Sequence, residues 1–94
     1  MNRRVAVTGM GVVSPVGNDV ETFWKNLKDG VCGIEQITDF DASPLAVKVA
    51  GTIKDFNPEN YGMARPFIRK QDPFTLYGMA AAWQAMQQSG LVAE

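Results

Sequence analysis

The sequence predicts an α/β chain, and three features along it carry this prediction. A short valine-rich apolar run opens the chain, two helical patterns follow, and a segment of alternating apolar residues lies between the helices. A chain of 94 residues allows at most one small domain. The apolar fraction of 46% is typical of a globular protein and not of a disordered one.

The first expected element is a buried strand over residues 4–8, Arg-Val-Ala-Val-Thr. It is rich in valine, carries apolar residues on both faces and ends at a glycine, as strands covered on both sides do. Residues 9–17 hold three glycines together with Ser14 and Pro15, which predicts a turn-rich loop.

A helix is predicted over residues 19–29, with Asn18 as its N-cap and Glu21 completing a capping box. Its apolar side chains recur at i, i+3, i+4 and i+7, which places them in one stripe. They are Val20, Phe23, Trp24 and Leu27. Gly30 is expected to follow the last turn of this helix.

The middle of the chain predicts less regular structure. Residues 31–44 are rich in glycine, aspartate, serine and proline and read as an irregular connection. From Leu45 to Ile53 the apolar residues mostly alternate, which indicates a half-exposed strand.

A second helix is predicted over residues 74–89, after the N-cap pair Asp72-Pro73 and before Gly90. Leu91 is expected to fold back on Met86 in a Schellman ending. Apolar side chains cover most of the circumference, whereas a surface helix has one apolar face. A stripe of small residues along it indicates that another backbone packs closely, and the stripe consists of Gly78, Ala82, Ala85 and Ser89. Such a helix belongs inside a larger protein, so the chain reads as a piece of one.

Composition excludes several classes of function. Nine basic and ten acidic residues give a net charge of −1, so no field of the whole chain attracts nucleic acid or an anionic membrane. No apolar stretch approaches the roughly 20 residues of a membrane span, and no signal peptide is visible. A single cysteine, Cys32, excludes an internal disulfide, which fits a cytoplasmic protein. The chain has no histidine, which removes the commonest general base and the commonest neutral metal ligand. Neither a metal site nor a cofactor is expected within it.

The Gly9-x-Gly11 pair raises the alternative of a dinucleotide-binding oxidoreductase. That fingerprint requires a third glycine where Ser14 stands and a helix that begins at once. The predicted helix begins near residue 19, too late for its N-terminus to reach a pyrophosphate held by the glycines. The acid expected about 20 residues further on would be Asp29, which falls inside a helix and not at a strand end. The glycines are therefore expected to serve backbone geometry and close packing, where a Cβ cannot fit.

Several motifs in order resemble the elongating β-ketoacyl-acyl-carrier-protein synthases and the related polyketide ketosynthases. They are "VAVTGMGVVSPVG", "FWKNLKDG", "DFNPENY" and "RKQDPFTLYGMAAAWQAMQQSGL". The resemblance implies a thiolase-like fold of two similar halves in αβαβα layers, of which residues 1–94 form the N-terminal part of the first half. It implies that residues 4–13 are the first strand of a central sheet, that residues 19–29 cover it, and that residues 74–89 lie between two sheets.

The resemblance also implies chemistry that this chain does not contain. Members of the family load an acyl group on a cysteine, decarboxylate malonyl-carrier protein with the help of two histidines, and join the resulting carbanion to the acyl group. Cys32 does not match the nucleophile's motif and is expected to be a small, semi-buried residue. The catalytic cysteine and histidines are expected downstream, so the 94 residues alone are expected to be inactive. The full-length enzyme is expected to be a homodimer.

Arg65, Arg69 and Lys70 are the candidate binding residues, since the family places basic residues here to dock the acidic acyl carrier protein. They are three of the nine positive charges and lie within six residues of one another. The alternative is a solvated basic face. Pro66, Phe67 and Ile68 occupy positions where the family often has polar or basic residues, and Gln71 replaces its usual methionine, so the footprint on the carrier is expected to differ.

Three other functions stay open at this stage. A polyketide ketosynthase or its chain-length-factor partner shares the fold. A non-catalytic carrier-protein-binding module would require these residues to fold alone. The dinucleotide-binding oxidoreductase is the weakest alternative.

Overall fold

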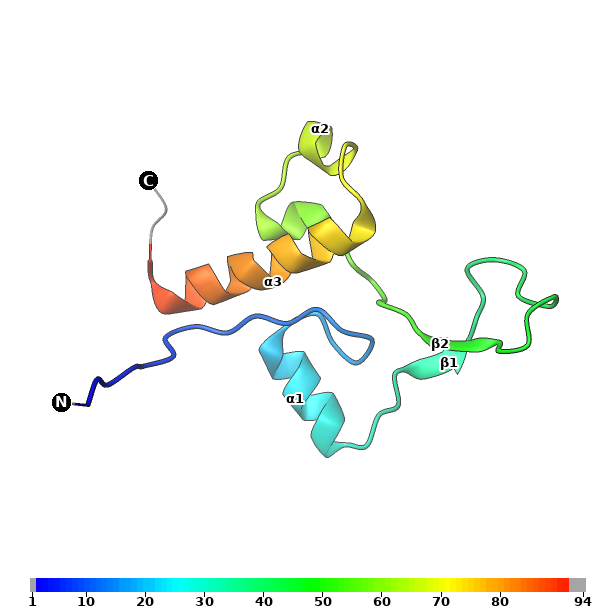
Figure 1. Cartoon of the computed structure of the whole chain (residues 1–94), viewed down its shortest axis with the longest axis horizontal. Helices are drawn as coiled ribbons and strands as arrows, with labels where there is room; N and C mark the ends of the chain where they lie inside the picture. Colours follow the sequence, from blue (N-terminus) through cyan, green and yellow to red (C-terminus); the bar gives the residue numbers. More distant parts are fainter. Residues whose placement is uncertain (1, 92–94) are drawn as a thin grey trace.

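The computed structural model describes residues 2–91 of the chain. Its elements are α1 (Val20–Lys28), β1 (Ile34–Gln36), β2 (Val49–Gly51), the 3-10 helix η1 (Pro58–Tyr61), α2 (Arg65–Ile68) and α3 (Pro73–Ser89). Figure 1 shows α3 lying along the extended N-terminal residues, with α1 on their other side and the β1–β2 hairpin projecting away. The molecule is elongated, with principal extents of 57 × 37 × 25 Å. Within the described residues no helix is both long and apolar enough to cross a membrane.

Helix α1 confirms the first predicted helix but not its cap. Asp19, and not Asn18, is the N-cap, and its carboxylate accepts hydrogen bonds from the Thr22 amide at 2.7 Å and from the Thr22 hydroxyl at 3.0 Å. The Asn18 amide nitrogen instead donates to the Lys54 carbonyl at 2.7 Å, which directs the side chain away from the helix, and its oxygen has no partner in the described residues. The predicted capping box of Asn18 and Glu21 is therefore wrong, because Asn18 makes a tertiary contact and does not cap the helix.

The C-terminus of α1 ends as predicted. Gly30 has a φ of 73°, in the left-handed region. Its amide donates to the Leu27 carbonyl at 3.2 Å, and the Val31 amide donates to the Asn26 carbonyl at 2.9 Å. These two bonds make a Schellman ending, in which glycine adopts a conformation that a side chain would strain.

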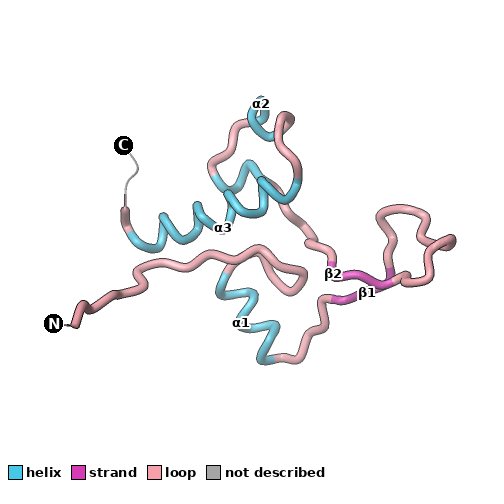
Figure 2. The backbone as a smooth tube through the Cα atoms, viewed as in Figure 1, coloured by secondary structure: helices cyan, strands magenta, loops and turns pink. Residues whose placement is uncertain are grey.

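Residues 4–13 are extended but form no strand ladder in the described part of the chain. Figure 2 shows this run as loop throughout. Val5 and Val7 are 91% and 80% exposed, so the expectation of a buried strand is not met here. A strand is defined by a hydrogen-bonded neighbour, and residues 2–91 supply none beside this segment.

The two-stranded sheet differs from the predicted strand over residues 45–53. Only Val49–Gly51 is strand, and it pairs antiparallel with β1, with Glu35 opposite Ala50. β1 lies in the segment expected to be irregular. Three residues are too few to show a hydrophobic period, so the partner strand and not the local pattern defines β1.

Helix α3 matches the second predicted helix, although its termini differ in detail. The Asp72 side chain makes no capping bond, and its carbonyl instead accepts from the amides of Thr75 and Leu76 at 3.0 and 3.3 Å. Gly90 has a φ of 77°, as expected after a helix. The Leu91 amide donates to the Ser89 hydroxyl at 3.2 Å and not to the Met86 carbonyl, so the described residues do not form the expected Schellman ending, and Leu91 is 66% exposed.

Gly9 and Gly11 lie directly against the backbone of α3. A methyl group on Gly9 would overlap the carbonyl oxygen of Ala85, and one on Gly11 would overlap the carbonyl oxygen of Ala81. The close approach therefore falls on the Ala81–Ala85 face of the helix, and Gly78 has open space beside it in the described residues. The predicted small-residue stripe is right about a closely packed backbone, which within residues 2–91 reaches Ala81 and Ala85 and not Gly78.

A small core lies on one side of α3. Met63, Leu76 and Ala80 are its buried members, and the partly buried side chains packed on them are Val13, Phe56, Tyr61, Phe67 and Ile68. Phe74, Met79 and Met86 on α3 stay exposed. The apolar pattern around α3 thus exceeds what residues 2–91 cover.

Candidate functional site

The three predicted binding residues lie together at one end of the molecule, on and just after α2. This short helix begins at Arg65, has Pro66 in its first turn, and continues in tight turns through Lys70. Phe67 and Ile68 are half-buried on the core that contains Leu76 and Ala80. They anchor the segment, whereas Arg65, Arg69 and Lys70 are exposed.

Phe67 and Ile68 therefore have a structural role. Packing Phe67 and Ile68 inward turns the basic side chains before and after them toward solvent. This packing holds the segment in place and leaves its basic side chains exposed.

One of the three basic residues is already paired. The Arg65 Nε lies 2.7 Å from Glu59 Oε1, and the two side chains are 74% and 46% exposed. Among the described residues, Arg69 and Lys70 take part in no ion pair. The site thus presents two uncompensated positive charges and one that is compensated.

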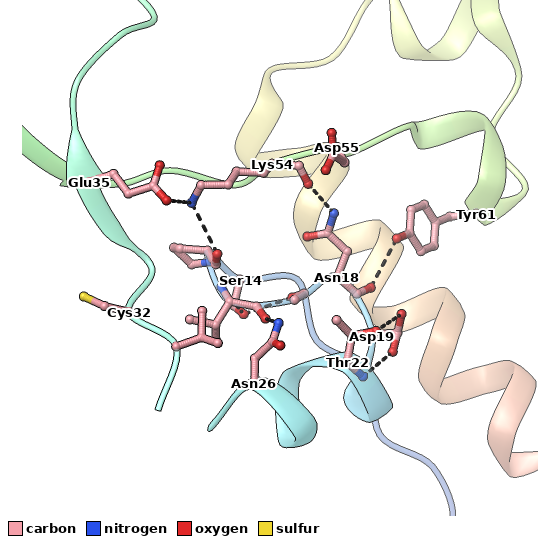
Figure 3. A pocket seen from close by; sticks show the side chains of 14 residues that line it. Ser14, Asn18, Asp19, Thr22, Asn26, Cys32, Glu35, Lys54, Asp55 and Tyr61 are labelled. Atoms are coloured by element: carbon pink, nitrogen blue, oxygen red, sulfur yellow. Dashed lines mark hydrogen bonds and ion pairs between the residues drawn. The ribbon is translucent and has the colours of Figure 1, made fainter. Parts of the chain in front are cut away.

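A polar pocket of about 460 Å³ lies away from this patch, where α1, β1 and the segment after β2 meet. Figure 3 shows Ser14, Asn18, Lys54 and Tyr61 directed toward it. The Tyr61 hydroxyl donates to the Asn18 carbonyl at 3.2 Å. Burial, and secondarily the Asp19 carboxylate, raise the pKa of Tyr61, so the hydroxyl stays a donor.

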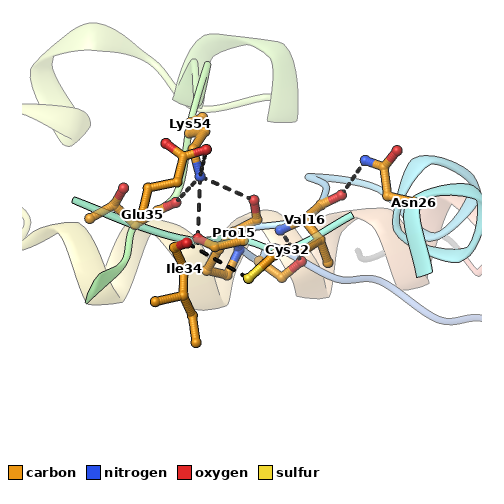
Figure 4. A network of polar contacts seen from close by, with 10 residues as sticks. Pro15, Val16, Asn26, Cys32, Ile34, Glu35 and Lys54 are labelled. Atoms are coloured by element: carbon orange, nitrogen blue, oxygen red, sulfur yellow. Dashed lines mark hydrogen bonds and ion pairs between the residues drawn. The ribbon is translucent and has the colours of Figure 1, made fainter. Parts of the chain in front are cut away.

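Lys54 holds three segments together at one side of this pocket. Its ammonium lies 3.2 Å from the Thr52 carbonyl, 3.4 Å from that of Pro15 and 3.5 Å from that of Gly33. Glu35 is its ion-pair partner at 3.9 Å (Figure 4). Lys54 therefore links the segments that carry Pro15, Gly33 and Thr52.

The pocket lacks the parts of a catalytic site. The Cys32 thiol is exposed, which corrects the expectation of a semi-buried residue, and it lies 3.7 Å from the Ile34 carbonyl. No base is hydrogen-bonded to it in the described residues, as an activated nucleophile would require. The described residues also bring together no group of three side chains able to hold a metal ion.

The geometry also answers the question of phosphate binding. Gly9 and Gly11 face carbonyl oxygens of α3, which would repel a phosphate. The N-terminus of α1 is occupied by its own Asp19 carboxylate, and Asp29 is the C-cap of that helix. The dinucleotide alternative is therefore not supported.

Residues 2–94 match the sequence profile of the family described as beta-ketoacyl synthase, N-terminal domain. The chain belongs to this family. A solved structure titled "The ishigamide ketosynthase/chain length factor" matches the fold with a TM-score of 0.85 and 32% identity, over 98% of this chain and 23% of that one. The predicted thiolase-like α/β fold class is thereby confirmed.

Curated relatives of this β-ketoacyl synthase domain agree in name. The 3-oxoacyl-[acyl-carrier-protein] synthase 2 of Vibrio harveyi is 51% identical over 89 residues, which is 95% of this chain and 21% of that protein. The protein of the same name from Staphylococcus aureus (strain COL) is 44% identical over 90 residues, 96% of this chain and 22% of its own length. The chain spans about a fifth of the length of these relatives.

Two residues with contacts between distant segments, Glu59 and Lys54, were not predicted from the sequence. Glu59 pairs with Arg65 across a turn at Gly62, and no helical or strand spacing links the two positions. Lys54 serves carbonyls from three segments, which only the tertiary fold brings together. The one available signal for Glu59 is that no other acid lies between Asp55 and Asp72.

Proposed function

We propose that the protein containing this chain is a β-ketoacyl-acyl-carrier-protein synthase of fatty acid elongation. The supporting observation is the 44–51% identity, over nearly the whole chain, to proteins named 3-oxoacyl-[acyl-carrier-protein] synthase 2. Residues 1–94 are then the N-terminal part of the first thiolase-like half. The whole protein acts in the cytoplasm as a homodimer, without a cofactor, and neither nucleic acid nor a membrane is among its partners.

The proposed reaction is a decarboxylative Claisen condensation. The acyl group passes from its carrier to a cysteine thiolate, malonyl-carrier protein loses carbon dioxide, and the carbanion attacks the acyl thioester and releases the cysteine. The residues for these steps lie outside this chain, which holds no histidine and one exposed, unactivated cysteine. What this chain supplies is part of the scaffold and the docking surface for the carrier.

The 94-residue chain alone is expected to form no β-ketoacyl product. It lacks an activated nucleophile and any general base of the histidine type. Incubating the purified chain with acyl- and malonyl-carrier protein, and analysing the carrier-bound product by mass spectrometry, tests this. The full-length enzyme at the same concentration is the positive control, and product from the short chain would disprove the expectation.

Replacing Arg65, Arg69 and Lys70 together with alanine is expected to weaken productive association with the carrier by about 5- to 150-fold. The carrier proteins of this family are acidic, so exposed basic residues act mainly through encounter rate and salt dependence. The measurement is the apparent KM of the full-length variant for acyl-carrier protein at several salt concentrations.

A small acyl thioester without a carrier is the matched substrate for this variant. If the three residues dock the carrier, turnover of the small thioester is preserved and the salt dependence of the carrier reaction flattens. Equal losses on both substrates would indicate a folding defect. No loss on either substrate would make the patch a solvated face.

A polyketide ketosynthase, or a chain-length factor without the nucleophile, is the second candidate. The fold match to a ketosynthase/chain length factor structure favours it, although at 32% its identity is below that of the fatty acid synthases. Thiol alkylation separates the possibilities in the full-length protein. Loss of condensation on alkylation of one cysteine indicates a ketosynthase, whereas a factor has no such cysteine. The products formed from fatty acyl and polyketide carriers then distinguish the two ketosynthases.

A further inference from the structure

The pairing of Glu59 with Arg65 is a feature that the proposed docking site does not by itself explain. Glu59 lies in η1, where Asn57 caps its amide at 3.1 Å, and Arg65 opens α2. The Arg65 Nε donates to Glu59 Oε1 at 2.7 Å across the left-handed turn at Gly62. η1 positions Glu59 and α2 positions Arg65, so the Glu59 carboxylate is directed at the basic segment.

The charge pattern around the pair is uneven. From residue 60 to residue 71 the ionisable side chains apart from Tyr61 are Arg65, Arg69 and Lys70, all positive. Glu59 compensates the first of these, and Arg69 and Lys70 have no ion-pair partner in the described residues. A partner that approaches this face therefore meets two free positive charges and one arginine already engaged.

We infer that Glu59 withholds Arg65 from the carrier protein and so lowers the affinity of the docking site. This inference rests on the proposed function and deepens it. An incoming carboxylate of the carrier must displace Glu59 or share the guanidinium with it, and in either case it gains less than it would from a free arginine. Arg69 and Lys70 then carry most of the docking, and Glu59 determines the contribution of Arg65.

The variant Glu59→Gln tests this inference, because glutamine keeps the shape and an acceptor oxygen but removes the charge. Binding of fluorescently labelled acyl carrier protein to the full-length enzyme, followed by anisotropy, gives the Kd. We expect Glu59→Gln to lower the Kd by about two- to fivefold, the size of one exposed charged contact, and to steepen its salt dependence. In an Arg65→Ala background the same substitution is expected to leave the Kd unchanged.

Asp72→Asn is the matched control for removal of one negative charge near the site. Asp72 lies at the other end of the basic segment, and its side chain makes no capping bond and no ion pair in the described residues. We expect its effect on the Kd to be smaller than that of Glu59→Gln. An equal effect, or a gain from Glu59→Gln that persists without Arg65, would overturn the inference and make Glu59 a simple repulsive charge.

The double variant Arg69→Ala/Lys70→Ala separates this inference from the proposed function. We expect it to raise the Kd by about four- to twentyfold, and Arg65→Ala alone to change it by less than about twofold. If the double variant binds normally, the docking proposal itself fails and the inference with it. If the double variant raises the Kd and Arg65→Ala raises it equally, the docking proposal is supported and the inference about Glu59 is wrong.

Discussion

Gly11→Ala is expected to destabilise the protein by about 1–3 kcal/mol or more. The added methyl would overlap the carbonyl oxygen of Ala81 and lie 2.8 Å from the Gln84 Cβ. Backbone atoms of a helix cannot move aside as the tip of a flexible side chain can, so the extended segment must lift from α3. The backbone of Gly11 does not itself require glycine, since its φ is not positive. Urea unfolding of the variant and the parent measures the difference in free energy.

Gly78→Ala is the matched control for this substitution. It adds the same methyl to a glycine that has no neighbour within 4 Å in the described residues. In the middle of a helix, alanine is favoured over glycine by about 1 kcal/mol, so this variant should keep or gain stability. If Gly11→Ala were as stable as Gly78→Ala, the close packing of the N-terminal segment on α3 would be refuted.

Gln84→Leu is expected to destabilise the protein by about 2–5 kcal/mol, because both backbone polar groups of Val12 lose their partner and the Asn18 carbonyl keeps only the Tyr61 hydroxyl. The Gln84 amide nitrogen donates to the carbonyls of Val12 at 3.0 Å and Asn18 at 2.7 Å. Its oxygen accepts from the Val12 amide at 3.2 Å. The glutamine thus satisfies both polar groups of Val12, as a neighbouring strand would. Chemical unfolding, with hydrogen exchange at the Val12 amide, provides the measurement.

Gln87→Leu makes the same chemical change on an exposed side of α3. The Gln87 side chain makes no hydrogen bond in the described residues, so its replacement should alter stability by no more than about 0.5 kcal/mol. Equal effects of the two substitutions would show that Gln84 acts through helix propensity and not through its contacts with Val12 and Asn18.

The helices of this protein are largely predictable from local signals. Gly30 and Gly90 end α1 and α3 because each residue takes the left-handed conformation that glycine allows. The cap of α1 shows where local reasoning stops. Asn18 and Asp19 are both good N-caps by type, and a bond from Asn18 to the distant Lys54 carbonyl decides between them.

Strands and the site depend on partners that a local pattern does not reveal. β1 is a strand because Val49–Gly51 pairs with it, and residues 4–13 form no ladder because residues 2–91 place no strand beside them. The basic segment at Arg65 was found through family resemblance, since three charges in six residues are also typical of a solvated face. Its pairing with Glu59 depends on the path of the chain through Gly62, which composition does not specify.

The hydrogen bonds from α3 to the extended segment have a consequence for synthesis of the chain. Gln84 and Gln88 bind the backbone of residues 72 and 78 positions earlier. A ribosome adds about 5–20 residues per second, so the segment waits roughly 4–16 s for the glutamines to be made. Throughout that time its valines and unpaired peptide groups are open to other nascent chains and to chaperones. The segment around Met10 and Val12 is therefore fixed in place only after α3 has been translated.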